Sequence, residues 1–196
     1  MLSSISHKLF FPINYSLNEG RIICDDVPGL PFKFEANRYM GTWYEIYHSK
    51  GEPFQPDSWT CTTAHYSNLN AEDGSFSVYN SGQGKRYGPR FGLTADAYCP
   101  SDTSTFGEGQ CFVSFFKQPF EAEPNYLVVD TDYDNYSIVY SCGEEDMQYL
   151  WFLSREPELS DDLYNSMLAT VAEKLPNYDL DQFIKDSQGH KCRYDE

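Results

Sequence analysis

Short runs of aromatic and β-branched residues alternate with polar breaks from residue 43 to residue 155. Gly, Asn, Asp and Pro fill the breaks, and apolar positions recur with a period of two, which is typical of antiparallel strands joined by hairpins. Residues 72–74 (Glu-Asp-Gly) and residues 130–135 mark two such hairpins. This region leaves about 14 residues for each of eight strand-and-turn units, which favours an eight-stranded up-and-down barrel. A seven-stranded sandwich fits the count nearly as well.

The hydrophobic period changes to about 3.6 residues after Pro157. Ser160 can cap a helix whose first turn holds Asp161 and Asp162, which the positive end of the helix dipole favours. Pro176 ends the pattern. The predicted fold class is therefore all-β: an eight-stranded antiparallel up-and-down barrel with one C-terminal α-helix packed outside. The helix would face the sheet through an apolar stripe made of Leu163, Met167, Val171 and Leu175.

The chain of 196 residues is long enough for one domain with a sizeable core. Residues 1–33 show no strong periodicity and contain three prolines, so we expect an extended N-terminal arm that lies across the body. This arm is also a candidate surface for a protein partner. Residues 34–192 form the predicted domain, and residues 193–196 form a tail.

The chain has 14 basic and 30 acidic residues, a net charge of −16. Such a surface repels phosphate backbones, so nucleic acid is not an expected partner. No apolar run approaches the ~20 residues that a membrane-spanning helix needs. Residues 116–120 are either an exposed apolar loop tip, with possible peripheral membrane contact, or buried. The basic cluster at residues 84–90 either pairs with a ligand carboxylate or is a solvated loop.

Six cysteines form no CxxC pair and do not group with the four histidines. This arrangement predicts three disulfides and no metal site. Disulfides require an oxidising compartment, so we expect a secreted or lumenal glycoprotein, although the first residues hold no recognisable export signal. Free cysteines in a reducing cell are the alternative. Two sequons make Asn14 and Asn135 candidate glycosylation sites.

Gly41 and Trp43 stand at the start of the first predicted strand. The interior of an eight-stranded barrel is either filled by side chains or able to hold one small ligand. Gly41 permits a tight backbone approach, and Trp43 can then cover the barrel floor. Arg155 ends the eighth predicted strand and can lie across the indole, a cation–π contact worth roughly 0.5–2 kcal/mol.

Four segments resemble the signature regions of the lipocalin family, in order and at suitable separations. They are FEANRYMGTWYE at residues 34–45, TDYDNY at 131–136, VYSC at 139–142 and LWFLSREP at 150–157. The closest resemblance is to the subgroup of apolipoprotein D, insect bilin-binding proteins and bacterial outer-membrane lipocalins, and it covers residues 24–192. The chain departs from this pattern in its long arm and around residues 82–110.

The resemblance implies binding and transport of a small hydrophobic ligand: a fatty acid, sterol, retinoid, carotenoid or bilin. No cofactor is required, although a lipid, carotenoid or tetrapyrrole could be bound. The resemblance also implies disulfides Cys24–Cys142 and Cys61–Cys192. Cys99 and Cys111 remain, and a bond between them would staple the turn-rich residues 100–109; two free thiols are the alternative.

Likeness to the ligand contacts of apolipoprotein D points to Tyr66, Asn80 and Trp151. Strand alternation adds residues expected on the same inward faces, namely Ala64, Val78 and Leu153. Phe115 and Tyr140 are further candidates from the fifth and seventh predicted strands. Tyrosine hydroxyls and Asn80 would orient the polar end of a ligand. For each of these residues, ordinary barrel core is the alternative to a ligand contact.

No catalytic constellation stands out. Every cysteine has a plausible disulfide partner, the histidines are scattered, and no Gly-x-Ser-x-Gly elbow appears. We therefore expect a binding protein and not an enzyme. The second hypothesis is a structural subunit of a larger assembly, whose barrel is filled by its own aromatic side chains.

Overall fold

The computed structural model describes residues 26–53, 55–84, 88–143 and 147–194. Eight antiparallel strands follow one another around a single sheet, and β1 pairs with both β2 and β8, so that the sheet closes on itself. The predicted eight-stranded barrel is thus confirmed, and the sandwich is excluded. The strands are β1 (Gly41–Ser49), β2 (Thr60–Ser67), β3 (Ser75–Gln83), β4 (Arg90–Tyr98), β5 (Gln110–Phe115), β6 (Tyr126–Thr131), β7 (Tyr136–Cys142) and β8 (Gln148–Ser154).

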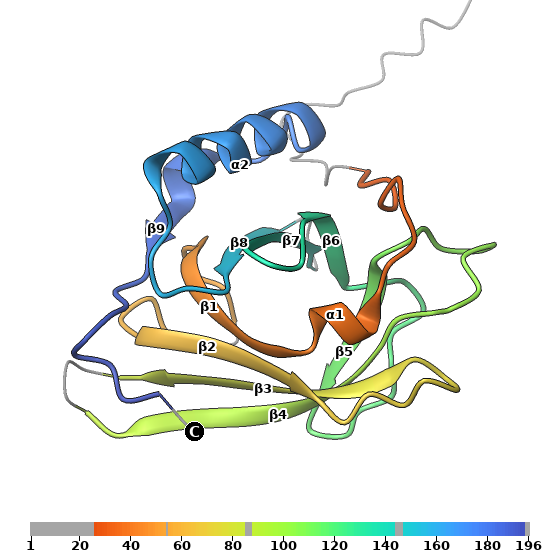
Figure 1. Ribbon diagram of the computed structural model, residues 1–196, viewed down its shortest axis with the longest axis horizontal. Helices are drawn as coiled ribbons and strands as arrows, with labels where there is room; N and C mark the ends of the chain where they lie inside the picture. Colours follow the sequence, from red (N-terminus) through yellow and green to blue (C-terminus); the bar gives the residue numbers. More distant parts are fainter. Residues whose placement is uncertain (1–25, 54, 85–87, 144–146, 195–196) are drawn as a thin grey trace, which may run out of the picture.

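The predicted helix, α2 (Asp161–Lys174), lies outside the barrel (Figure 1). Ser160 caps it by accepting a hydrogen bond from the backbone N–H of Leu163 at 3.2 Å. Met167, Val171 and Leu175 are fully buried in an outer cluster with the outward-facing side chains of β6 to β8. The fold therefore has two apolar cores, one inside the barrel and one between the barrel and α2.

A short ninth strand, β9 (Phe183–Lys185), was not predicted. It follows the 3₁₀ turn η2 (Leu180–Gln182) and pairs with the distal half of β1, whereas the first half of β1 pairs with β2. The two halves are separated by an irregularity in β1 between Glu45 and Tyr47. The C-terminal segment thereby enters the seam between β1 and β2 and completes the barrel wall there.

The described part of the arm, residues 26–33, runs without regular structure into the short helix α1 (Ala36–Tyr39). Val27 and Leu30 are buried, and the Leu30 N–H donates to the carbonyl of Glu108 at 2.7 Å. This part of the arm is therefore packed against the barrel. Residues 1–25, which hold most of the predicted partner surface, lie outside the described residues.

Two predicted disulfides are confirmed, Cys61–Cys192 and Cys99–Cys111. Cys142 is also disulfide-bonded. Its predicted partner, Cys24, lies outside the described residues, as does the candidate glycosylation site Asn14.

Candidate ligand cavity

The closed end of the barrel is built on Trp43, which is completely buried. The guanidinium carbon of Arg155 lies 3.7 Å from the centroid of the indole ring. The same guanidinium donates hydrogen bonds to the carbonyls of Thr42 (2.9 Å), Arg38 (2.8 Å) and Tyr133 (3.0 Å). Arg155 therefore ties three chain segments together beneath the ring, which supports the predicted role of the pair as a barrel floor.

Three tyrosine hydroxyls form a chain just inside this floor. The Tyr39 hydroxyl bonds that of Tyr126 (2.9 Å) and Ser137 Oγ (2.8 Å), and Tyr126 in turn bonds Tyr66 (2.7 Å). Burial raises the pKa of Tyr39 to about 12 and raises those of Tyr66 and Tyr126 well above the usual value. These hydroxyls stay protonated and form hydrogen bonds with one another. These three tyrosines are therefore not free to orient a ligand, although the sequence analysis expected tyrosine hydroxyls to do so.

A cavity of about 890 Å³ opens above this layer and extends to the other end of the barrel. Its volume lies within the ~300–1,000 Å³ range of small-molecule sites. Seven of the eight residues predicted to contact a ligand line it: Ala64, Tyr66, Val78, Asn80, Phe115, Trp151 and Leu153. Cross-strand pairing explains the grouping, because Trp43 pairs with Ala64 and Ala64 pairs with Asn80.

The prediction that the Tyr140 side chain faces the barrel interior was wrong. Tyr140 is completely buried in the outer cluster, where its hydroxyl donates to Gln148 Oε1 at 2.9 Å. Its neighbour Val139 pairs with Trp151 and lines the cavity, as does Ser141. Because side chains alternate along a strand, an error of one residue moves a side chain to the opposite face.

The mouth of the cavity is apolar and partly exposed. Phe91, Phe116 and Met147 line the cavity and remain 49–73% exposed. Trp59 stacks near Phe91, with ring centroids 6.5 Å apart. The segment 116–120, for which the sequence left both possibilities open, exposes Phe116 and, by 41%, Phe120.

The basic cluster at residues 84–90 is described only in part. Arg90 points to the outer surface, where its guanidinium donates to the carbonyl of Cys61 and to the hydroxyls of Thr63 and Ser81. It also lies over the ring of Tyr194 at 5.8 Å. Arg90 therefore holds the C-terminal tail against β2 and β3, while residues 85–87 lie outside the described residues.

An acidic cluster that the sequence did not reveal lies on the seam beside the cavity. Glu45 lines the cavity, accepts a hydrogen bond from Gln55 Nε2, and places Oε1 3.0 Å from His48 Nδ1. Asp186 accepts from the backbone N–H of Thr62 at 2.9 Å and from the amide of Gln188 at 3.0 Å. Strand alternation from Trp43 could have placed Glu45 inside the barrel. No local sequence pattern indicates that the C-terminal segment, with Asp186, packs beside it.

Burial shifts the titration of this seam. Burial, and then the negative charge of Glu45, raises the pKa of Asp186 from 3.8 to about 7. Burial lowers the pKa of His48, but the hydrogen bond and charge of Glu45 outweigh it and leave that pKa raised. The seam therefore holds protons more tightly than the same groups would in an unfolded chain.

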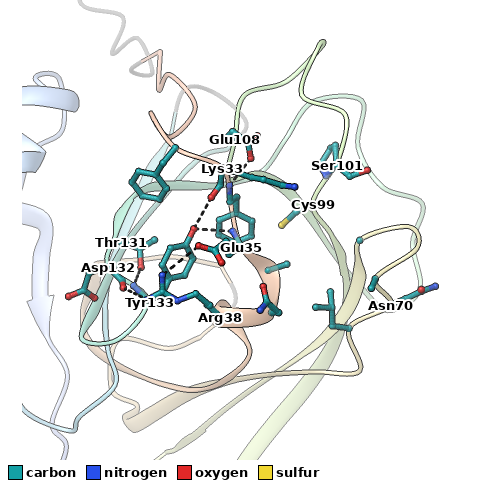
Figure 2. A pocket seen from close by; sticks show the side chains of 18 residues that line it. Lys33, Glu35, Arg38, Asn70, Cys99, Ser101, Glu108, Thr131, Asp132 and Tyr133 are labelled. Atoms are coloured by element: carbon teal, nitrogen blue, oxygen red, sulfur yellow. Dashed lines mark hydrogen bonds and ion pairs between the residues drawn. The ribbon is translucent and has the colours of Figure 1, made fainter.

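A second hollow, of about 910 Å³, lies outside the closed end between the arm and the hairpin turns (Figure 2). Its polar groups are largely paired with one another. Glu108 Oε2 accepts from the Phe34 N–H at 2.7 Å, and the Tyr133 hydroxyl accepts from the Glu35 N–H at 3.0 Å. Trp43 and the tyrosine layer separate this hollow from the barrel interior, so we take the interior as the candidate site.

The geometry at Asn135 disfavours a glycan. Although Asn135 is exposed, its amide donates to Asp132 Oδ2 at 2.6 Å within the β6–β7 turn. The hydroxyl residue of this sequon, Ser137, is fully buried against Tyr39. Neither group is available on the folded surface in the way that a glycan attachment site requires.

Within residues 26–53, 55–84, 88–143 and 147–194, no three His, Cys, Asp or Glu side chains are arranged to hold a metal ion. Within the same ranges, no helix has the length and apolar character needed to cross a membrane.

A closed antiparallel barrel, plugged at one end and open to an apolar cavity at the other, defines a class of proteins that enclose small hydrophobic molecules. The family description "Lipocalin-like domain" matches residues 34–188, and the chain belongs to this family. The resemblance predicted from the four sequence segments is thus confirmed. Lipocalin proteins bind small hydrophobic ligands and are generally not enzymes.

Individual relatives agree with this assignment. The chain is 32% identical to the Lazarillo protein of Schistocerca americana over 165 residues, which cover 81% of this chain and 72% of that protein. It is 34% identical to the outer membrane lipoprotein Blc of Escherichia coli over 155 residues, or 77% of each chain. The crystal structure of insecticyanin from Manduca sexta superposes with a TM-score of 0.70 at 25% identity, covering 87% of this chain and 89% of that one.

Proposed function

We propose that this protein is a carrier that binds one small hydrophobic molecule inside the barrel and acts without catalysing a reaction. The single observation that supports this function most is the cavity of about 890 Å³ above an intact floor. A cavity of this size is difficult to reconcile with a structural subunit whose barrel is filled by its own side chains. The disulfides favour a secreted or lumenal compartment.

The ligand contacts follow from the lining. Trp151, Tyr66, Val78 and Leu153 provide the apolar surface, and Asn80 provides a polar group among them. A sterol, retinoid, carotenoid, bilin or fatty acid has the right size and character. For a ligand of ~20–25 heavy atoms, a typical gain of about 0.3 kcal/mol per atom gives an affinity near the micromolar range.

Exposed rings at the mouth suggest how the ligand enters. Phe91 and Phe116 are 55% and 73% exposed at the rim of the cavity. Transient contact of this rim with a lipid surface would spare an insoluble ligand a passage through water. Because the net charge is −16, an uncharged or zwitterionic surface suits the protein better than an anionic one.

A cavity-filling substitution tests the function. Ala64 lines the cavity, whereas its neighbour His65 is exposed on the outer face. Ala64→Phe should weaken binding of retinyl acetate, an uncharged apolar probe, at least tenfold, because the new ring occupies the site, whereas the matched control His65→Phe should bind as the wild type does. Binding is measured by quenching of tryptophan fluorescence, and folding is checked by circular dichroism.

Native mass spectrometry of the gently purified protein provides a second readout. A co-purifying apolar molecule, absent from Ala64→Phe, agrees with a carrier. Wild-type protein that is empty and takes up no apolar probe would refute the proposal and favour the structural subunit.

A further inference from the structure

Two buried polar atoms in the cavity wall have no hydrogen-bond partner among the described residues: Asn80 Oδ1 and Thr62 Oγ1. Both side chains line the cavity, and Thr62 is only 3% exposed. A buried acceptor without a donor is costly in an empty site, and it becomes favourable when a ligand supplies the donor. The wall therefore offers a place for a hydrogen-bonding group inside the barrel.

Neighbouring polar groups in the cavity already form hydrogen bonds within the protein. Asn125 uses both ends of its amide on the backbone of Val113, at 2.8 and 2.9 Å. Tyr66 and Tyr126 bond each other at 2.7 Å. This contrast separates Asn80 from residues whose polar groups form hydrogen bonds within the protein.

The two atoms lie on neighbouring strands. Asn80 pairs with Ala64, and Thr62 precedes Ala64 by two positions on the same strand. Gly82, two positions beyond Asn80, leaves room next to Thr62: a Cβ atom there would lie 3.2 Å from Thr62 Oγ1 and 2.8 Å from the ring of Trp59. The Trp59 ring thus covers this part of the wall and limits its contact with water.

The charged residues in the described part of the cavity lining have one sign. Glu45, Glu52 and Glu121 line it, and the first two are only 7% and 5% exposed. None of the described lining residues is Lys, Arg or His. An anionic ligand would lose its hydration and meet these carboxylates, with no Lys or Arg among the described lining residues to compensate, which disfavours its binding.

On the basis of the proposed carrier function, we propose that the cavity selects an apolar ligand whose polar end is an uncharged hydroxyl group. Asn80 Oδ1 accepts the hydrogen bond from this hydroxyl, and Thr62, whose side chain also interacts with the Asp186 carboxylate, borders the same part of the wall. Glu45 and Glu52 act against ligands that end in a carboxylate. Of the classes with suitable size, sterols, retinols and hydroxylated carotenoids fit, whereas fatty acids and carboxylate-bearing bilins do not.

Three retinoids with the same polyene separate these chemistries. Retinol has a hydroxyl donor, retinyl acetate is uncharged without a donor, and retinoic acid is anionic at pH 8. We expect retinol to bind about tenfold more tightly than either of the others, measured by quenching of tryptophan fluorescence at pH 8. A tenfold ratio corresponds to about 1.4 kcal/mol, the size of one good hydrogen bond to a buried group.

Two substitutions assign the effect to residues. Asn80→Leu should lower retinol affinity to that of retinyl acetate and leave retinyl acetate binding within about twofold. Glu45→Gln should raise the affinity for retinoic acid severalfold without changing that for retinol. Circular dichroism establishes that each variant is folded, and the wild-type ratios test the proposal even if a variant is not.

The outcomes distinguish the two proposals. If retinyl acetate binds and Ala64→Phe blocks it, but retinoic acid binds as tightly as retinol, the carrier function stands and the hydroxyl selectivity is refuted. An unchanged retinol preference in folded Asn80→Leu also refutes the role of Asn80. Failure of all three probes to bind refutes the carrier function and this inference with it.

Discussion

The closed and open ends of the barrel solve opposite problems. At the closed end, Trp43 is fully buried, and Arg155 and the tyrosine chain satisfy the polar groups around it. At the open end, the wall contains unpaired acceptors, buried carboxylates and exposed phenyl rings. The stabilising contacts therefore lie at the end where no ligand enters. The unfavourable features that a binding site requires, unpaired acceptors, buried carboxylates and exposed rings, lie towards the mouth.

Each end carries one described disulfide. Removing each disulfide in turn should give the largest difference in unfolding free energy between the two ends. Cys61–Cys192 joins residues 131 positions apart near the cavity, and Cys99–Cys111 joins residues 12 apart beside the closed-end hollow. Replacing both cysteines by serine should cost about 5 kcal/mol for the first pair and about 3 kcal/mol for the second, from loop-closure entropy. Urea unfolding measures both. Equal losses would show that chain entropy does not govern the two bonds.

Trp43 in the floor and Trp151 in the cavity wall give the next comparison. Trp43→Ala should lower the free energy of unfolding by about 3–5 kcal/mol, because it opens a void in a closely packed floor. Trp151 lines an existing cavity and is only partly buried, so Trp151→Ala should cost about 1–2 kcal/mol and weaken ligand binding instead. Denaturant unfolding and retinyl acetate titration of the same two variants measure the split. A larger stability loss for Trp151→Ala would reverse the assignment of floor and wall.

The third comparison is a pH dependence confined to the open-end seam. Asp186 lies near Glu45 and His48, and its pKa is raised to about 7. Because the folded protein holds this proton more tightly than the unfolded chain, the contribution of Asp186 is complete below about pH 4 and is lost as the pH rises through about 7. The raised pKa of His48 acts in the same direction, with its contribution lost above about 6.5.

We therefore expect the wild type to lose about 2–4 kcal/mol of unfolding free energy between pH 5 and pH 8. Asp186→Asn keeps an oxygen that can accept from the Thr62 N–H and should remove most of this slope. Asp73 is fully exposed, and hydrogen bonds from Ser75 lower its pKa, so Asp73→Asn should leave the slope over this range unchanged. Urea unfolding across the range provides the measurement, and a wild-type curve that rises with pH would contradict the assignment.

Local patterns predicted much of the fold, and the family resemblance together with strand alternation predicted part of the site. The period-two runs indicated eight strands, and the period of 3.6 with Ser160 located α2. Two of the three disulfide pairings and seven inward-facing residues also agree with the structure. Tyr140 was misplaced because an aromatic strand with apolar cores on both faces carries no local signal of which face is the interior.

The sequence by itself determined the strand order, the outer helix and the tryptophan and arginine of the floor, because these depend on periodicity, caps and turns that neighbouring residues define. Only the tertiary structure decided what surrounds the cavity mouth. The Gln188 amide donates to the carbonyl of Glu45 across 143 positions of sequence, and this contact exists only because an irregularity in β1 lets the C-terminal segment enter the seam. The buried charges and unpaired acceptors beside it result from that long-range closure, which no local pattern encodes.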